Sequence, residues 1–304
     1  MKKLFLLLGC IAAFSSCLKN DKWESDVVDN GVAIYVNVLM QNQLALDPFN
    51  IAFRLNSLIV EGNGDYTAAS EKIKETLLGR DVKIAYDEIS GIYTVTFDKS
   101  KTEFTRSGSV QIKTNGFATL GESMAQWQVS LPSVTPYTVA DETESATINP
   151  GASYSIQNTG NNAWRVSMQT FVASLGNQDF DGTVVEMASK WTGYYLVEQL
   201  SGTQKYEDIS KSVYSVATDI ANSTMTSLPF DVDKLSVRSI DNPLKFNPGC
   251  SLWLPVGSGK MVIMFTEDDT FQNLTDVEVL GTDNKTCRPV TRVKYRGLSK
   301  EVQL

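Results

Sequence analysis

Apolar and polar residues alternate along most of the chain with the two-residue period of a β-strand. Residues 127–131 read Trp-Gln-Val-Ser-Leu and residues 164–168 read Trp-Arg-Val-Ser-Met, so each segment carries a tryptophan on its apolar face. We therefore expect Trp127 and Trp164 to lie in the core. The same alternation predicts further strands at residues 31–38, 51–55, 82–86, 92–97, 109–113, 154–156, 184–188, 194–200, 213–220, 235–237, 252–256, 277–280 and 290–295.

Three segments add detail to this pattern. Residues 261–265 are apolar at every position, which is typical of a strand that is buried on both faces. Residues 210–220 fit either a strand or a helix. An Asn/Gly-rich segment at residues 158–162 predicts a turn between strands.

A helical period stands out between residues 68 and 78. Ala69, Ile73 and Leu77 recur at i, i+4 and i+8, and Gly79 follows at a position that commonly ends a helix. We expect this helix to cover one face or one end of a sheet.

Many short strands without alternating helices predict a mostly β fold. Pro132, Pro136 and the acidic segment 141–144 interrupt the strand pattern, which indicates a boundary or a long connection between residues 132 and 150. The expected architecture is two β-sandwich or barrel-like domains, residues 31–140 and 141–304, with one short helix in the first.

The N-terminus has the order of a secretory leader. Two lysines precede an apolar run at residues 4–14, which is too short to span about 30 Å of hydrocarbon, and Ser15 and Ser16 lead to Cys17. This order resembles the lipobox of bacterial lipoproteins. Cys10 also follows a short apolar run. Cleavage before Cys17 gives the signal peptide a longer apolar run than cleavage before Cys10, so Cys17 is preferred.

The resemblance implies cleavage before Cys17, so that residues 1–16 are a signal peptide. It also implies diacylglycerol on the Cys17 sulfur and stable anchoring through several acyl chains. The polar residues 17–30 look like the tether of Bacteroidetes-type cell-envelope lipoproteins. The expected location is the bacterial outer membrane, facing either the periplasm or the cell surface.

Composition excludes several classes of function. The chain has no histidine, so it cannot build a Ser-His-Asp triad, a Cys-His dyad or a histidine-bearing zinc site. Its net charge is −8, without a long basic block, so we expect no nucleic-acid partner. The sequence Gly257-Ser-Gly-Lys260 lacks the first glycine of a phosphate-binding loop, where Leu254 stands, and indicates a hairpin turn.

Asn177, Asp179 and Asp181 resemble the first ligands of a calcium loop, and Gly182 follows at the expected place. The bidentate glutamate of such a loop is replaced by Ala188, so a calcium site would need distant ligands. A polar turn is the other interpretation. No other cofactor is expected.

Aromatic side chains that lie outside the core are candidates for stacking on sugar rings. Trp253 lies on the face of its strand opposite to the leucines, and Trp191 and Tyr194 flank a turn at Gly193. These three residues are the predicted ligand contacts, and packing between sheets or domains is the alternative role.

The two cysteines of the body, Cys250 and Cys287, each share the apolar face of a predicted strand. A disulfide between them and two buried free thiols are both compatible with an exported protein.

These features favour a lipid-anchored binding or scaffold protein of the cell envelope, with glycans or an envelope protein as partners. A fimbria-like structural subunit that exchanges a strand is the alternative. An acid–base glycoside hydrolase is the third hypothesis. The sequence does not single out a catalytic pair of carboxylates among Asp231, Asp233, Glu267, Asp268 and Asp269.

Acylation at Cys17 is directly testable. We expect metabolic labelling with a palmitate analogue to mark the wild-type protein, and Cys17→Ala to accumulate as an unlabelled precursor, because the thiol that receives the lipid is gone. Cys10→Ala serves as the control and should keep the label. Label retained in Cys17→Ala would show that the lipid is attached elsewhere.

Overall fold

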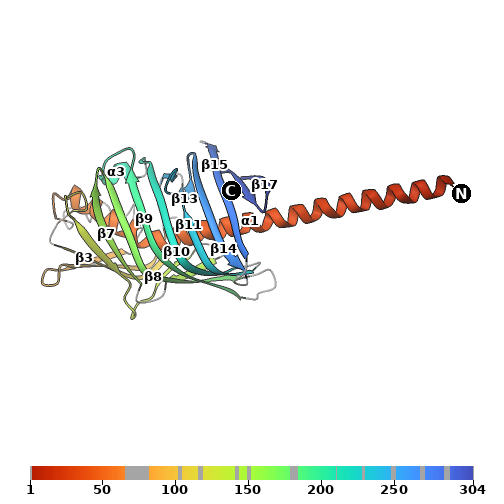
Figure 1. The fold of residues 1–304 in the computed structure, drawn as a ribbon. Helices are drawn as coiled ribbons and strands as arrows, with labels where there is room; N and C mark the ends of the chain where they lie inside the picture. Colours follow the sequence, from red (N-terminus) through yellow and green to blue (C-terminus); the bar gives the residue numbers. More distant parts are fainter. Residues whose placement is uncertain are drawn as a thin grey trace.

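A long helix and a strongly curved antiparallel sheet make up the described part of the chain (Figure 1). The computed structural model describes residues 2–65, 82–101, 105–115, 119–140, 144–148, 152–178, 184–209, 211–227, 230–247, 251–267, 271–283 and 288–303. The helices are α1 (Lys2–Glu61) and α3 (Tyr206–Ile209). The strands are β1 (Val82–Asp87), β2 (Ile92–Lys101), β3 (Thr105–Thr114), β4 (Gln126–Ser130), β5 (Tyr137–Ala140), β6 (Glu144–Ile148), β7 (Ser153–Gly160), β8 (Ala163–Gln178), β9 (Val184–Gln199), β10 (Tyr214–Ser227), β11 (Phe230–Arg238), β12 (Leu244–Asn247), β13 (Ser251–Pro255), β14 (Gly259–Glu267), β15 (Phe271–Asp283), β16 (Arg288–Tyr295) and β17 (Leu298–Gln303).

The strands follow one another as an antiparallel meander, and those of the described residues belong to one 17-stranded sheet. At three places two short strands lie end to end along the same longer neighbour. β4 and β5 both pair with β3, β6 and β7 with β8, and β11 and β12 with β10. The prediction of a mostly β fold is confirmed.

The sheet is continuous across residues 132–150, where the sequence predicted a boundary. β5 and β6 pair with each other there, and β4 pairs with β7, so strands on both sides are joined by hydrogen bonds. Pro132 and Pro136 therefore lie at the break between β4 and β5, which run end to end along β3. The predicted division at residues 140 and 141 does not separate two sheets.

The strands predicted at residues 31–38 and 51–55 are wrong, because both segments lie in α1. Buried positions there recur every three or four residues from Val27 to Leu39, and residues 44–59 are buried all round. A short apolar window fits either period, whereas the longer pattern fits only a helix. The helix predicted at residues 68–78 lies outside the described residues.

Two other patterns are resolved by the structure. The segment 213–220, which also fitted a helix, is mostly strand and opens β10, with α3 just before it. Met261, Ile263 and Phe265 are buried, whereas Val262 and Met264 between them are half-buried, so β14 is not enclosed on both faces as expected. The curved sheet has a single inner face, and the outer face of β14 has no second layer among the described residues.

α1 lies along the concave side of the sheet, and its N-terminal part extends beyond the sheet (Figure 1). The inward faces of the strands supply a core that packs on this helix, and Trp127 and Trp164 are fully buried, as predicted. Phe53 of α1 meets Trp164 edge-on, with 5.0 Å between ring centroids, and Tyr214 of β10 at 5.8 Å. The helix therefore takes the place of a second sheet.

Near the edge of the sheet formed by its C-terminal strands, the helix passes very close to β16. A Cβ atom at Gly31 would stand 2.5 Å from Cβ of Tyr295, so only glycine permits this approach. Beside it, Lys300 of β17 forms an ion pair with Asp29. These contacts define where α1 enters the sheet.

Inside the sheet, Asp47 of α1 forms a buried ion pair with Arg106 of β3. Arg106 donates from Nη2 to Oδ1 at 2.7 Å and from Nε to Oδ2 at 3.1 Å, and the Tyr137 hydroxyl also donates to Oδ2. Burial alone would raise the pKa of Asp47, but the Arg106 charge and the hydrogen bonds outweigh it and hold that pKa below its ordinary value. The carboxylate is therefore charged and fully hydrogen-bonded in the core.

Removing one partner of this pair should be costly. We expect Asp47→Leu or Arg106→Met to lose about 3–5 kcal/mol of unfolding free energy, since each leaves an uncompensated buried charge. The triple variant Asp47→Leu, Arg106→Met, Tyr137→Phe should lose much less, because neither charge of the pair is left buried without the other. Urea unfolding of the four proteins measures this. A loss below about 1 kcal/mol in both single variants would contradict the role of the pair.

The depressed pKa of Asp47 also predicts how stability depends on pH. Because the folded pKa lies below the unfolded value of about 3.9, the contribution is complete above about pH 5 and is lost as pH falls through the folded pKa. The unfolding free energy of the wild type should thus exceed that of Asp47→Asn by a constant amount near neutral pH and by less in acid. Urea titrations at several pH values test this, and a difference that stays unchanged down to pH 2.5 would refute it.

Candidate functional site

The predicted aromatic pair does not form a joint site. Trp191 is 0% exposed on the inner face of β9. Tyr194 lies on the opposite face and is half-buried, with the Arg165 guanidinium 3.7 Å from its ring centroid. One ring is thus part of the core, and the other has a face covered by a cation.

The remaining predicted site residues fall wholly or partly outside the described structure. Asp179, Asp181, Cys250 and Cys287 lie outside the described residues. Asn177 is in β8, Trp253 in β13 and Cys17 in α1, but only their backbone is described. Within the described part of the chain, no group of three or more metal-ligating side chains comes together.

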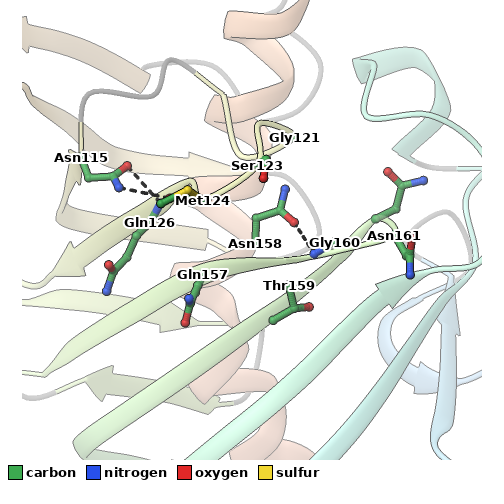
Figure 2. Close-up of a pocket in the computed structure, with 11 residues that line it drawn as sticks. Asn115, Gly121, Ser123, Met124, Gln126, Gln157, Asn158, Thr159, Gly160 and Asn161 are labelled. Carbon is green, nitrogen blue, oxygen red and sulfur yellow. Dashed lines mark hydrogen bonds between the residues drawn. The ribbon is translucent and has the colours of Figure 1, made fainter.

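An open groove of about 610 Å³ lies at the end of the sheet where β3, β4 and β7 meet their loops (Figure 2). It is formed by the start of β4, the end of β7, the β7–β8 turn and the loop at residues 119–125. Its lining residues are Asn115, Gly121, Ser123, Met124, Gln126, Gln157, Asn158, Thr159, Gly160, Asn161 and Asn162.

Side-chain amides dominate this lining, and no charged side chain is among the described residues that form it. An amide offers two N–H donors and a carbonyl acceptor without a net charge. None of the described residues hydrogen-bonds to the side chains of Gln157, Asn161 or Asn162, whereas Met124 is 75% exposed and adds an apolar surface. The groove can therefore bind a neutral ligand with many polar groups.

The β7–β8 turn presents two of these amides. Asn161 and Asn162 have φ values of 52° and 56°, which is the left-handed geometry of a two-residue hairpin. Asparagine tolerates this geometry better than most residues with a side chain, and Asn158 stabilises the turn by accepting a 2.6 Å hydrogen bond from the Gly160 amide. Glycine would fit the same backbone without the side chain.

The opposite wall, residues 119–125, is attached to both neighbouring strands. The Leu120 carbonyl accepts hydrogen bonds from Asn158 Nδ2 at 2.8 Å and from the Trp164 indole at 2.9 Å. The Asn115 amide spans the base of the loop, donating to the Met124 carbonyl and accepting from the Gln126 amide (Figure 2). Two residues that line the groove, Asn115 and Asn158, thus also hold this wall in place.

Sequence reasoning recognised residues 158–162 as a turn but did not assign them to a site. A usable signal was present, since four amide side chains fall within residues 157–162. Their proximity to the loop at residues 119–125 depends on the pairing of β4 with β7, which joins Gln126 to Gln157.

Within the described residues, no helix combines the length and the apolar character needed to cross a membrane. Comparison of the chain with protein-family models, with curated proteins and with solved structures found no match.

Proposed function

We propose that the chain is a lipid-anchored binding protein of the bacterial cell envelope, and that its ligand is an uncharged glycan held in the amide-lined groove. The observation that carries the proposal is the groove itself. It is open, it is neutral, and amides from two turns converge on it.

Sugar hydroxyls match this lining because each can both donate and accept a hydrogen bond, as can each amide. The described lining residues include no charged side chain, so none of them would form an ion pair with a charged ligand. The proposal differs from the sequence expectation in one respect, since no aromatic ring lines the groove among the described residues. Met124 offers the apolar contact that a ring would otherwise make.

The position of the groove suits an anchored receptor. Asn56 of α1 contacts the groove wall at Leu120, whereas Asp29 marks the other end of the enclosed helix. At 1.5 Å per residue, Cys17 and Asn56 are roughly 60 Å apart along α1. A lipid on Cys17 would therefore be attached at the far end of α1 from the groove.

The alternative of a strand-exchanging subunit finds less support. The last strand, β17, would be the element to exchange, but it carries two exposed charged residues, Lys300 and Glu301, one on each face. These residues form ion pairs with Asp29 of α1 and Arg292 of β16, respectively. Charges on an edge strand oppose pairing with another chain.

A glycan array tests the proposal. We expect the full chain, solubilised in detergent, to bind neutral glycans in preference to anionic ones. The double variant Asn161→Gly, Asn162→Gly should weaken binding about tenfold or more, because it removes two amides and keeps the turn geometry.

The matched control is Gln128→Ala, which removes an exposed amide from β4 outside the groove and should bind as the wild type does. Equal affinity of the double variant and the control would place the ligand elsewhere. Absence of neutral-glycan binding by the wild type would refute the proposed ligand class.

A further inference from the structure

Asn56 is a polar residue of α1 that is fully buried where the helix meets the groove wall. Its Oδ1 atom accepts a 2.6 Å hydrogen bond from the backbone amide of Leu120, and its Nδ2 atom donates to Oε1 of Gln204 at 3.2 Å. One side chain thus connects the helix to two loops that are distant in sequence.

The Leu120 peptide is held from both sides by these contacts. Its N–H is bound by Asn56, and its carbonyl is bound by Asn158 and Trp164 of the sheet. The Leu120 side chain is buried, whereas Gly121 and Ser123 beyond it line the groove. The position of Leu120 therefore sets where this wall of the groove begins.

Gln204 supports the same wall from its outer side. A Cβ atom at Gly121 would stand 2.9 Å from Gln204 Oε1, so the two loops pack with almost no space between them. Since Gln204 also receives the Asn56 hydrogen bond, the helix fixes both members of this contact.

We infer that Asn56 is a positioning residue of the groove, through which the enclosed helix holds the wall at residues 119–125 in its binding geometry. The expected effect of Asn56 on ligand affinity rests on the proposed function, whereas its expected effect on the order of the wall does not. Asn56 itself does not line the groove, so it acts only through Leu120 and Gln204.

The test compares Asn56→Leu, which keeps a buried side chain of similar size and removes both hydrogen bonds, with two controls in the full chain. Ser57→Ala removes a hydroxyl whose one hydrogen bond among the described residues is to the Phe53 carbonyl of the same helix. Val237→Ala creates a cavity in β11, away from the groove, and controls for a general loss of stability.

The first readout is amide hydrogen exchange, which needs no ligand. We expect exchange at Leu120 and the following wall residues to rise roughly tenfold or more in Asn56→Leu relative to both controls. Gln204→Ala, a half-exposed position that should fold in any case, should give a smaller rise in the same residues. Unchanged wall exchange in both variants would overturn the inference.

The second readout is affinity for maltohexaose, a neutral oligosaccharide, measured by titration calorimetry. Weaker binding by Asn56→Leu than by both controls supports the inference. Faster wall exchange with unchanged affinity would overturn the link between the wall and binding. If the wild type binds no maltohexaose, the glycan proposal loses support, and the exchange result alone decides the positioning role.

Discussion

The buried pair of Asp47 and Arg106 is the interaction on which the arrangement of helix and sheet depends. Each polar group that a helix buries beneath a sheet costs free energy unless it has a hydrogen-bond partner, because water cannot reach it there. A buried carboxylate such as Asp47 costs more free energy than a neutral polar group when it lacks a partner. Arg106 of β3 and Tyr137 of β5 both donate hydrogen bonds to it. Apolar packing alone would allow α1 to slide or rotate, whereas this pair fixes its depth and its orientation.

Other polar residues of α1 follow the same principle at different depths. Asn42 accepts a hydrogen bond from the Tyr195 hydroxyl of β9 at 2.8 Å, and Arg54 donates to Asn50 one turn earlier at 3.0 Å. Asn56 closes the series at the groove wall. The contacts of Asn42, Asp47 and Asn56 with the sheet and its loops therefore place the helix, and the groove lies at the end of this series.

Local periodicity predicted most of the sheet because its outer face is exposed to solvent and its inner face is buried. The alternation around Trp127 and Trp164 shows this pattern. The same reasoning failed for α1. Residues 31–38 bury only one side of α1, but over so short a window their apolar residues also alternate as in a strand. Residues 51–55 are buried on all sides, so they have no polar face that would reveal a helix. The partners of Asp47 are 59 and 90 residues away, and no local pattern contains them. The groove was missed for the same reason, since Gln126 and Gln157 become neighbours only through strand pairing.

The enclosure of α1 also constrains the order in which the protein can fold. Asp29 is paired with Lys300, 271 residues later in the chain, and Gly31 packs against Tyr295. The helix is synthesised first, but the segment around Asp29 and Gly31 meets its partners only when the last two strands have been made. Contacts of such long sequence separation slow folding, since the entropy of closing the chain is lost before they form. Closing the sheet over the entrance of α1 therefore has to wait for its last two strands, β16 and β17.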